Sequence, residues 1–212
     1  MSTEIFVNDQ IVAHVDDDGY ITDLTVEGQR MHFVQSPRWD DLRFPAQGLN
    51  PAGQAAPPTI DDTTFPGTLL FSGSIINVQG GVAQMPHAWE KGTAVRPHLH
   101  WSKTTSVSGG VVWQWRYTKA NIGDVFGAYS AWIDAVPAVP HSYTANKQAI
   151  DAFPELDMTE NRESAVICWE FRRNPTVGGD TYGANARLYE FDIHYQVGKL
   201  GTVTEIPVGT VV

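Results

Sequence analysis

Apolar and polar residues alternate with a period of two along three stretches of the chain, 111–119, 164–173 and 187–197. Successive side chains of a strand point to opposite faces, so this alternation predicts antiparallel strands with one buried face. The side chains expected on the buried faces are Val111, Trp113, Trp115 and Tyr117 in the first stretch, Ala165, Ile167, Trp169 and Phe171 in the second, and Tyr189, Phe191, Ile193, Tyr195 and Val197 in the third. Residues 69–78 and 95–103 are also strand-like. The pattern predicts an all-β chain, a two-sheet antiparallel β-sandwich of the jelly-roll kind.

A hairpin is expected near the N-terminus. Residues 11–15 and 20–26 are strand-like and flank an Asp-Asp-Asp-Gly run at 16–19. An Asp-Gly pair between two such runs is a strong turn signal. A calcium loop fits the run less well, because Tyr20 and Ile21 stand where an EF-hand requires a ligand and a glycine.

Proline interrupts the strand pattern between residues 37 and 66. Six of the thirteen prolines fall there, namely Pro37, Pro45, Pro51, Pro57, Pro58 and Pro66. Proline has no N–H to donate to a sheet and fixes φ, so long regular strands or helices are excluded. We expect either a long Pro-rich extended arm whose backbone pairs with a neighbouring subunit, or a solvated surface loop.

These patterns divide one structural domain into four parts. They are an N-terminal hairpin or attachment segment at 1–36, the Pro-rich extended arm at 37–68, the β-sandwich core at 69–200 and a C-terminal tail at 201–212. Within the core, residues 126–158 are less regular, and we expect short strands, long loops and one helical turn near 146–153 there.

Charge and composition narrow the classes of partner. The formal net charge is −10, and the largest cluster of basic residues is the pair Arg172–Arg173, so we expect no binding to nucleic acid. The uncharged stretch 68–89 is too rich in Gly, Ser, Asn, Gln and Pro to span a membrane. The first residues carry no basic and apolar pattern of a secretion signal. The single cysteine, Cys168, excludes an intramolecular disulfide and lies in a strand pattern, where we expect a buried small side chain.

His98 and His100 form the pattern with the clearest chemical meaning. In a strand their side chains point to the same side, as a metal-binding pair requires. The polar face of the last predicted strand adds Asp192 and His194, and such a set suits zinc, manganese or iron. Cupin enzymes hold such sites inside a double-sheet barrel, but a glutamate usually follows within about four residues, and 102–105 contain none. We therefore expect hydrogen bonds on a polar sheet face or at a subunit contact, with a cupin-like metalloenzyme as the alternative.

Other catalytic patterns have little support. Glu170, Glu190 and Asp192 could flank a glycosidic bond, but acids on strand faces are usually solvated. The chain contains no nucleophile elbow, P-loop or dinucleotide motif. Tryptophans at alternating strand positions are expected in the core rather than on a stacking platform: Trp101, Trp113, Trp115 and Trp169. We expect the protein not to be an enzyme and to need no cofactor.

Several segments share a further likeness. They are Pro-Arg-Trp-Asp-Asp-Leu-Arg-Phe-Pro at 37–45, Met-Pro-His at 85–87, Arg-Pro-His-Leu-His-Trp at 96–101 and Phe-Asp-Ile-His-Tyr at 191–195. Together they resemble segments of a group of tailed-bacteriophage and prophage virion proteins, and the resemblance covers roughly residues 37 to 200. None of these motifs is a catalytic signature.

The resemblance implies a β-sandwich structural protein of the virion, assembled in the host cytoplasm and often homotrimeric. Such proteins decorate or cement the head, or belong to the tail or its fibres and bind a host receptor. The implied partners are other copies of the chain and the major capsid protein or other virion proteins, with no nucleic acid and no membrane. Residues expected to anchor the subunit to its neighbours are Trp39, Asp40, Asp41, Leu42, Arg43, Phe44 and Pro45.

Overall fold

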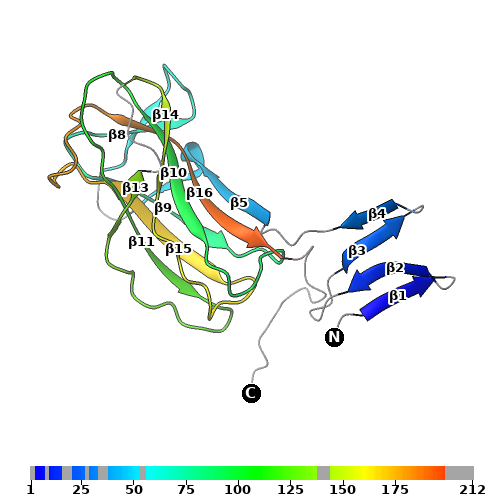
Figure 1. Ribbon diagram of the computed structural model, residues 1–212. Helices are drawn as coiled ribbons and strands as arrows, with labels where there is room; N and C mark the ends of the chain where they lie inside the picture. Colours follow the sequence, from blue (N-terminus) through cyan, green and yellow to red (C-terminus); the bar gives the residue numbers. More distant parts are fainter. Residues whose placement is uncertain are drawn as a thin grey trace. The chain divides into compact units, whose positions relative to one another are not determined.

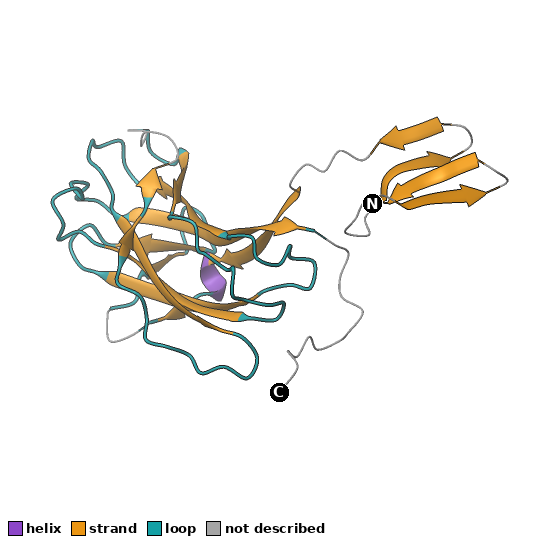
Figure 2. Ribbon diagram, turned by 60° about the horizontal axis from the view of Figure 1, so that its bottom comes forward, coloured by secondary structure: helices purple, strands orange, loops and turns teal. Residues whose placement is uncertain are grey.

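The computed structural model describes residues 38–52, 56–137 and 144–198, together with the backbone of four strands between residues 3 and 32 (Figure 1). Contacts group the chain into two compact units, Met1–Arg38 and Trp39–Val212. The described residues are almost entirely strand and loop, and their helical part is the single 3-10 turn η1 at Ala46–Gly48 (Figure 2). None of the described helices is long and apolar enough to cross a membrane.

The first unit is a four-stranded antiparallel sheet in which neighbours in sequence are neighbours in space. Its strands are β1 (Thr3–Val7), β2 (Gln10–Val15), β3 (Ile21–Val26) and β4 (Gln29–His32). β2 and β3 form a hairpin in which Ala13 lies opposite Leu24. The Asp-rich turn expected at 16–19 and the tail expected at 201–212 lie outside the described residues.

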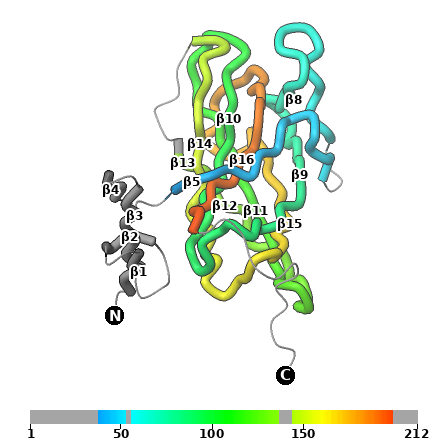
Figure 3. The backbone as a smooth tube through the Cα atoms, turned by 90° about the vertical axis from the view of Figure 1, so that its right-hand side faces the viewer, coloured from blue at the N-terminus to red at the C-terminus, as the bar shows by residue number. Residues whose placement is uncertain are grey.

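The second unit contains two antiparallel sheets. Its strands are β5 (Arg38–Pro45), β6 (Asn50–Pro51), β7 (Thr59–Asp61), β8 (Thr68–Phe71), β9 (Asn77–Gln84), β10 (Arg96–Lys103), β11 (Trp113–Ala120), β12 (Ile133–Asp134), β13 (Val136–Pro137), β14 (Gln148–Ala152), β15 (Val166–Arg173) and β16 (Ala186–Val197). The larger sheet has the order β13-β14-β10-β16-β8-β7, with β5 also paired to β16. The smaller sheet has the order β12-β11-β15-β9-β6. Figure 3 labels its strands β9, β11, β12 and β15.

The pairing of the main strands is nested. β8 pairs with β16, β9 with β15, β10 with β14, and β11 with β12, so the first of these strands meets the last and the middle ones meet each other. This is the connectivity of one long hairpin folded over into two sheets, which is the jelly roll. The pairs β10–β16 and β11–β15 then join the halves within each sheet. The predicted all-β, two-sheet sandwich is confirmed.

Aromatic side chains fill the space between the two sheets. Trp113, Trp115 and Trp169 are at most 1% exposed, as the alternation predicts. The ring centroid of Phe191 in the larger sheet lies 4.3 Å from that of Trp169 in the smaller one, and Trp101 lies 5.9 Å from Trp113 in the same way. Offset and edge-to-face aromatic pairs across a core stabilise it beyond simple burial of apolar area. The predicted tryptophan core is therefore present, and these rings are not a surface platform.

The alternation breaks at Tyr189. Opposite β10, His100 pairs with Glu190 but Trp101 pairs with Leu188, so Tyr189 is the extra residue of a β-bulge. The bulge moves Leu188, rather than Tyr189, into the core. Tyr189 was expected on the core face but is only half-buried.

The prediction of a helical turn near residues 146–153 is wrong. Residues Gln148–Ala152 form strand β14, which extends the larger sheet by pairing with β10. Its burial alternates, with Ala149 and Asp151 buried between less buried neighbours. A segment of five residues is too short for periodicity to distinguish the two structures, and pairing with a neighbouring strand decided the outcome.

The Pro-rich segment takes backbone partners from its own chain. β5 pairs with β16, β6 with β9 and β7 with β8. Asp61 at the end of β7 is 3% exposed and forms a 2.7 Å ion pair with the buried Arg187 of β16. The described part of this segment is thus built into the edges of the sandwich, where we had expected pairing with another subunit or with solvent.

Candidate functional site

The resemblance segments on β5, β10 and β16 meet on the outer face of the larger sheet. The register of β10 against β16 places His98 opposite Asp192 and Arg96 opposite His194. Their neighbours in sequence, such as Leu99, point into the aromatic core and are fully buried. Because side chains alternate along a strand, the histidines and Asp192 lie on the side of the sheet that faces away from the core.

His98, His100 and Asp192 form a tight cluster on this face. The Nε2 atoms of His98 and His100 are 3.1 Å apart. Oδ2 of Asp192 lies 3.5 Å from Nε2 of His98 and 3.2 Å from Nε2 of His100. The three ligand atoms therefore satisfy the geometric condition for holding one metal ion. His98 and Asp192 are buried, with 5% and 3% of their surface exposed, and His100 is half-buried.

The charge state of Asp192 depends on its histidine partners. Burial would raise the pKa of this carboxyl group, but hydrogen bonds from His100 and His98 outweigh burial and lower the pKa to about 2. Its second oxygen, Oδ1, is buried and has no hydrogen-bond partner. The cluster therefore contains a buried carboxylate with one oxygen that the described protein groups leave unused.

The other ring nitrogens of the two histidines also have partners. Nδ1 of His98 lies 3.4 Å from the carbonyl oxygen of Arg96. Nδ1 of His100 lies 2.8 Å from the side-chain amide of Gln148, on β14. These contacts hold both rings with Nε2 pointing into the cluster.

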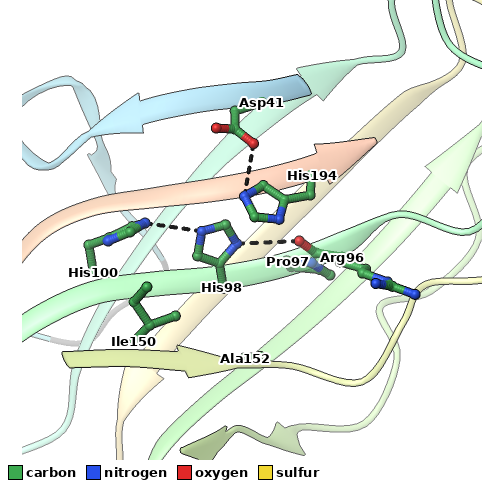
Figure 4. A pocket seen from close by; sticks show the side chains of 8 residues that line it. All are labelled: Asp41, Arg96, Pro97, His98, His100, Ile150, Ala152 and His194. Carbon is green, nitrogen blue, oxygen red and sulfur yellow. Dashed lines mark hydrogen bonds and ion pairs between the residues drawn. The ribbon is translucent and has the colours of Figure 1, made fainter. Parts of the chain in front are cut away.

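β5 covers one side of the cluster. Asp41 Oδ1 lies 2.9 Å from Nε2 of His194, and the ring of His194 packs against that of His98 with centroids 4.2 Å apart (Figure 4). Burial lowers the pKa of His194, and the nearby His98 lowers it further, against the opposing effect of Asp41. His194 is thus held by Asp41 and lies beside the cluster of His98, His100 and Asp192 without belonging to it. The sequence places His194 with Asp192 because the two residues share one face of the strand.

The segment expected to contact other subunits makes many contacts within its own chain. Tyr195 donates a 3.0 Å hydrogen bond to Asp40, and burial together with this bond raises the pKa of Tyr195 to about 12. Arg43 donates two hydrogen bonds, of 2.9 and 2.7 Å, to the carboxylate of Glu190. The side chains that complete this internal packing are Trp39, which stacks on Arg96, and Leu42 and Phe44, which pack against the core. The anchoring role expected for residues 39–45 therefore competes with their role in holding β5 onto β16.

A pocket of about 290 Å³ opens beside the cluster. Its lining residues, all drawn in Figure 4, are Asp41, Arg96, Pro97, His98, His100, Ile150, Ala152 and His194. Cupin enzymes place their metal between the two sheets, whereas here that space is occupied by aromatic rings and the pocket lies outside the larger sheet.

The remaining sequence candidates do not form a second site. Cys168 is half-buried, and burial raises the pKa of its thiol, which disfavours the reactive thiolate. Glu170 is bound by Arg116 at 2.6 Å, on the smaller sheet, and Glu190 is bound by Arg43 on the larger one. The acids considered for glycoside hydrolysis thus do not face each other across a cleft.

Comparison with known proteins gives no family. No family model matches the chain, and no curated protein matches it. Among solved structures, the enzymatically active domain of tailspike protein 4 of bacteriophage CBA120 aligns with 75% of this chain and 19% of its own, at 9% identity and a TM-score of 0.34. Dimeric latent PorU of Porphyromonas gingivalis aligns with 77% of this chain and 14% of its own, at 10% identity and a TM-score of 0.34. A likeness this distant carries no argument about function.

Proposed function

We propose that the protein is a structural component of a tailed-phage virion that decorates or cements the capsid. The observation that carries this proposal is the convergence of three of the four resemblance segments. Residues 38–45, 96–101 and 191–195 are far apart in sequence, yet β5, β10 and β16 bring them onto one face through the pairs Trp39–Arg96, Asp40–Tyr195 and Asp41–His194. Segments that share a resemblance and also share a face are expected to serve one purpose.

The filled interior supports a role in binding rather than in catalysis. Small-molecule sites of enzymes are usually concave, deep and partly apolar. In the described residues the space between the sheets is packed with aromatic rings, and the sandwich therefore acts through its surfaces and loops. The compact unit Met1–Arg38 is a candidate for the attachment element, since the core residues of the jelly roll all belong to the second unit.

Copy number in the particle tests this proposal. Virions produced from the genome that encodes the chain would be purified, and the protein would be quantified by mass spectrometry against the major capsid protein. A decoration protein is expected in hundreds of copies per particle. A few to a few dozen copies would instead assign it to the tail or its fibres, and its absence from purified particles would overturn the proposal.

We also propose that the chain assembles as a homotrimer, as the resemblance implies, and the loop between β11 and β12 offers a contact surface for it. Within eight residues it exposes four large apolar side chains, and contiguous apolar exposure is typical of interaction sites. They are Ile122, Val125, Phe126 and Tyr129, with exposed fractions of 48%, 92%, 44% and 39%.

Light scattering of the purified chain should give three times the 23.4 kDa of one copy. Val125→Asp should reduce that mass, and Val107→Asp, at a residue 60% exposed outside this loop, should leave it unchanged. An unchanged mass in Val125→Asp would remove this loop from the interface.

Deleting residues 46–66 of the Pro-rich segment tests whether this segment is needed for assembly. We expect the truncated chain to fold but to fail to assemble. We also expect it to lose stability, because the deletion removes Asp61 and leaves its partner Arg187 buried without a carboxylate. The truncated chain should therefore be less stable as well as defective in assembly, which thermal unfolding of the truncated protein would measure.

A further inference from the structure

We propose that His98, His100 and Asp192 bind one divalent first-row transition-metal ion, with zinc as the representative ion. The inference goes beyond the virion role and does not depend on it. It rests on the positions of three ligand atoms, on an unpartnered buried oxygen and on the partners of the two rings.

The spacing of the three atoms suits a single ion. For separations of 3.1, 3.2 and 3.5 Å, the point equidistant from the atoms lies about 1.9 Å from each of them. Zinc binds histidine nitrogen at roughly 2.0–2.1 Å and carboxylate oxygen at roughly 2.0–2.2 Å. An ion slightly out of the plane of these atoms therefore reaches all three at normal bond lengths without a change of rotamer.

One oxygen of the Asp192 carboxylate has no hydrogen-bond partner among the described residues. Asp192 is 3% exposed, and its Oδ1 atom is buried, so bulk water does not reach that oxygen. Such an arrangement is costly for a protein to bury, and a cation, with a water bound to it, would satisfy it.

The partners of the rings are those that metal-binding histidines commonly have. A ligating imidazole usually donates its other N–H to a carbonyl or carboxylate, which fixes the tautomer and the orientation. His98 has the Arg96 carbonyl in this position, and His100 has the Gln148 side chain. The amide of Gln148 can turn so that its oxygen accepts from Nδ1 of His100, because the two orientations differ only in the exchange of O and N.

The donor set identifies the class of ion. Calcium and magnesium prefer oxygen ligands in sets of six or more, whereas two imidazoles and one carboxylate favour zinc, iron, nickel or copper. Nε2 of His194 is held by Asp41, so the protein supplies three ligands and the remaining positions are left to water or a small ligand in the pocket. The ion would also tie β10 to β16 at the centre of the larger sheet.

Titration of the untagged 212-residue chain with Zn²⁺ tests the proposal. After treatment with a chelator and removal of the chelator, calorimetry should show a site of one equivalent, and the visible spectrum of bound Co²⁺ should report nitrogen and oxygen ligation. Binding should raise the melting temperature by about 5–10 °C when free Zn²⁺ is 100-fold above its Kd. His98→Ala and Asp192→Ala should weaken this site by about 100-fold or more, and Gln148→Ala by about 10–100-fold.

His87→Ala is the matched control, since it removes an imidazole that is hydrogen-bonded to Ser164 and is not part of the cluster. Its affinity should stay within about twofold of the unaltered chain. Far-UV circular dichroism identifies any variant that fails to fold, and the Co²⁺ spectrum of the unaltered chain tests the site independently of the variants. The proposal is overturned if the unaltered chain binds no Zn²⁺, if His98→Ala and Asp192→Ala retain the site when folded, or if His87→Ala loses as much affinity as they do.

Discussion

The ion pair of Arg173 and Asp180 allows a quantitative test of how the jelly roll is held together. Arg173 lies at the end of β15, and its side chain and that of Asp180 are 0% and 1% exposed. The guanidinium donates to both carboxylate oxygens, at 2.9 and 2.8 Å. It also donates to the backbone carbonyls of Phe71, Tyr182 and Ala184. This one side chain therefore joins the end of β15 to β8 and to the loop that leads into β16.

Asp180→Ala would leave the guanidinium buried with no counter-charge. Breaking a buried pair by removing one partner typically costs about 3–5 kcal/mol, because the remaining charge cannot reach water. The backbone N–H of Val112 loses its 3.0 Å bond to the same carboxylate, which adds to the loss. For a chain of this size we expect the melting temperature to fall by about 6–20 °C.

Chemical denaturation followed by tryptophan fluorescence would measure the change in the free energy of unfolding. All seven tryptophans lie between Trp39 and Trp169, so the signal reports the jelly-roll unit and not the N-terminal sheet. Glu155→Ala is the control, because its ion pair with Arg96 is exposed, at 54% and 52%, and such pairs contribute less than about 1 kcal/mol. If Asp180→Ala costs no more than Glu155→Ala, the buried pair does not hold the fold in the way argued above.

Two further changes follow from contacts in the same unit. A hydrogen bond from the Thr64 N–H, supported by the arginine partner and opposed by burial, lowers the pKa of Asp61 to about 2. A carboxyl group with a depressed pKa stabilises the fold above its unfolded value of about 3.9 and loses that contribution as the pH falls towards 2. The stability gap between the unaltered chain and Asp61→Asn should therefore close over this range, and a gap independent of pH would contradict the assignment. Gly81→Ala would place a Cβ 2.5 Å from the indole of Trp169 and should cost about 1–3 kcal/mol in denaturation experiments, whereas Gly48→Ala, which meets nothing within 4 Å, should be close to neutral.

The sequence predicts those parts of the fold that depend on local periodicity. The alternation in 111–119 and 164–173 identifies the buried face of β11 and β15 correctly, because the side-chain direction in a strand follows from position. It fails at Tyr189, since a bulge is defined by the partner strand and leaves no mark on the strand that contains it. The helical turn expected in place of β14 fails for a related reason, because that strand exists through its pairing with β10.

The candidate site, like the fold, is predictable from the sequence only where it depends on local geometry. His98 and His100 share a face by local geometry, so the sequence identifies this pair as candidate ligands. The position of Asp192 opposite His98, and of Asp41 beside His194, depends on the register of strands that lie far apart in the chain. No local signal in a single sequence carries that register.

The register also determines whether a metal could bind at all. The proposed ligands come from β10 and β16, which pair with each other across more than ninety residues of sequence. A slip of β16 by one residue would turn Asp192 towards the aromatic core and bring Phe191 to the outer face. Such a slip would bury a carboxylate among rings, so the core and the site select the same register. Because the unfolded chain does not hold Asp192 beside the two histidines, the full affinity for metal at this site would be a property of the correctly paired sheet, and binding would stabilise that pairing over any other.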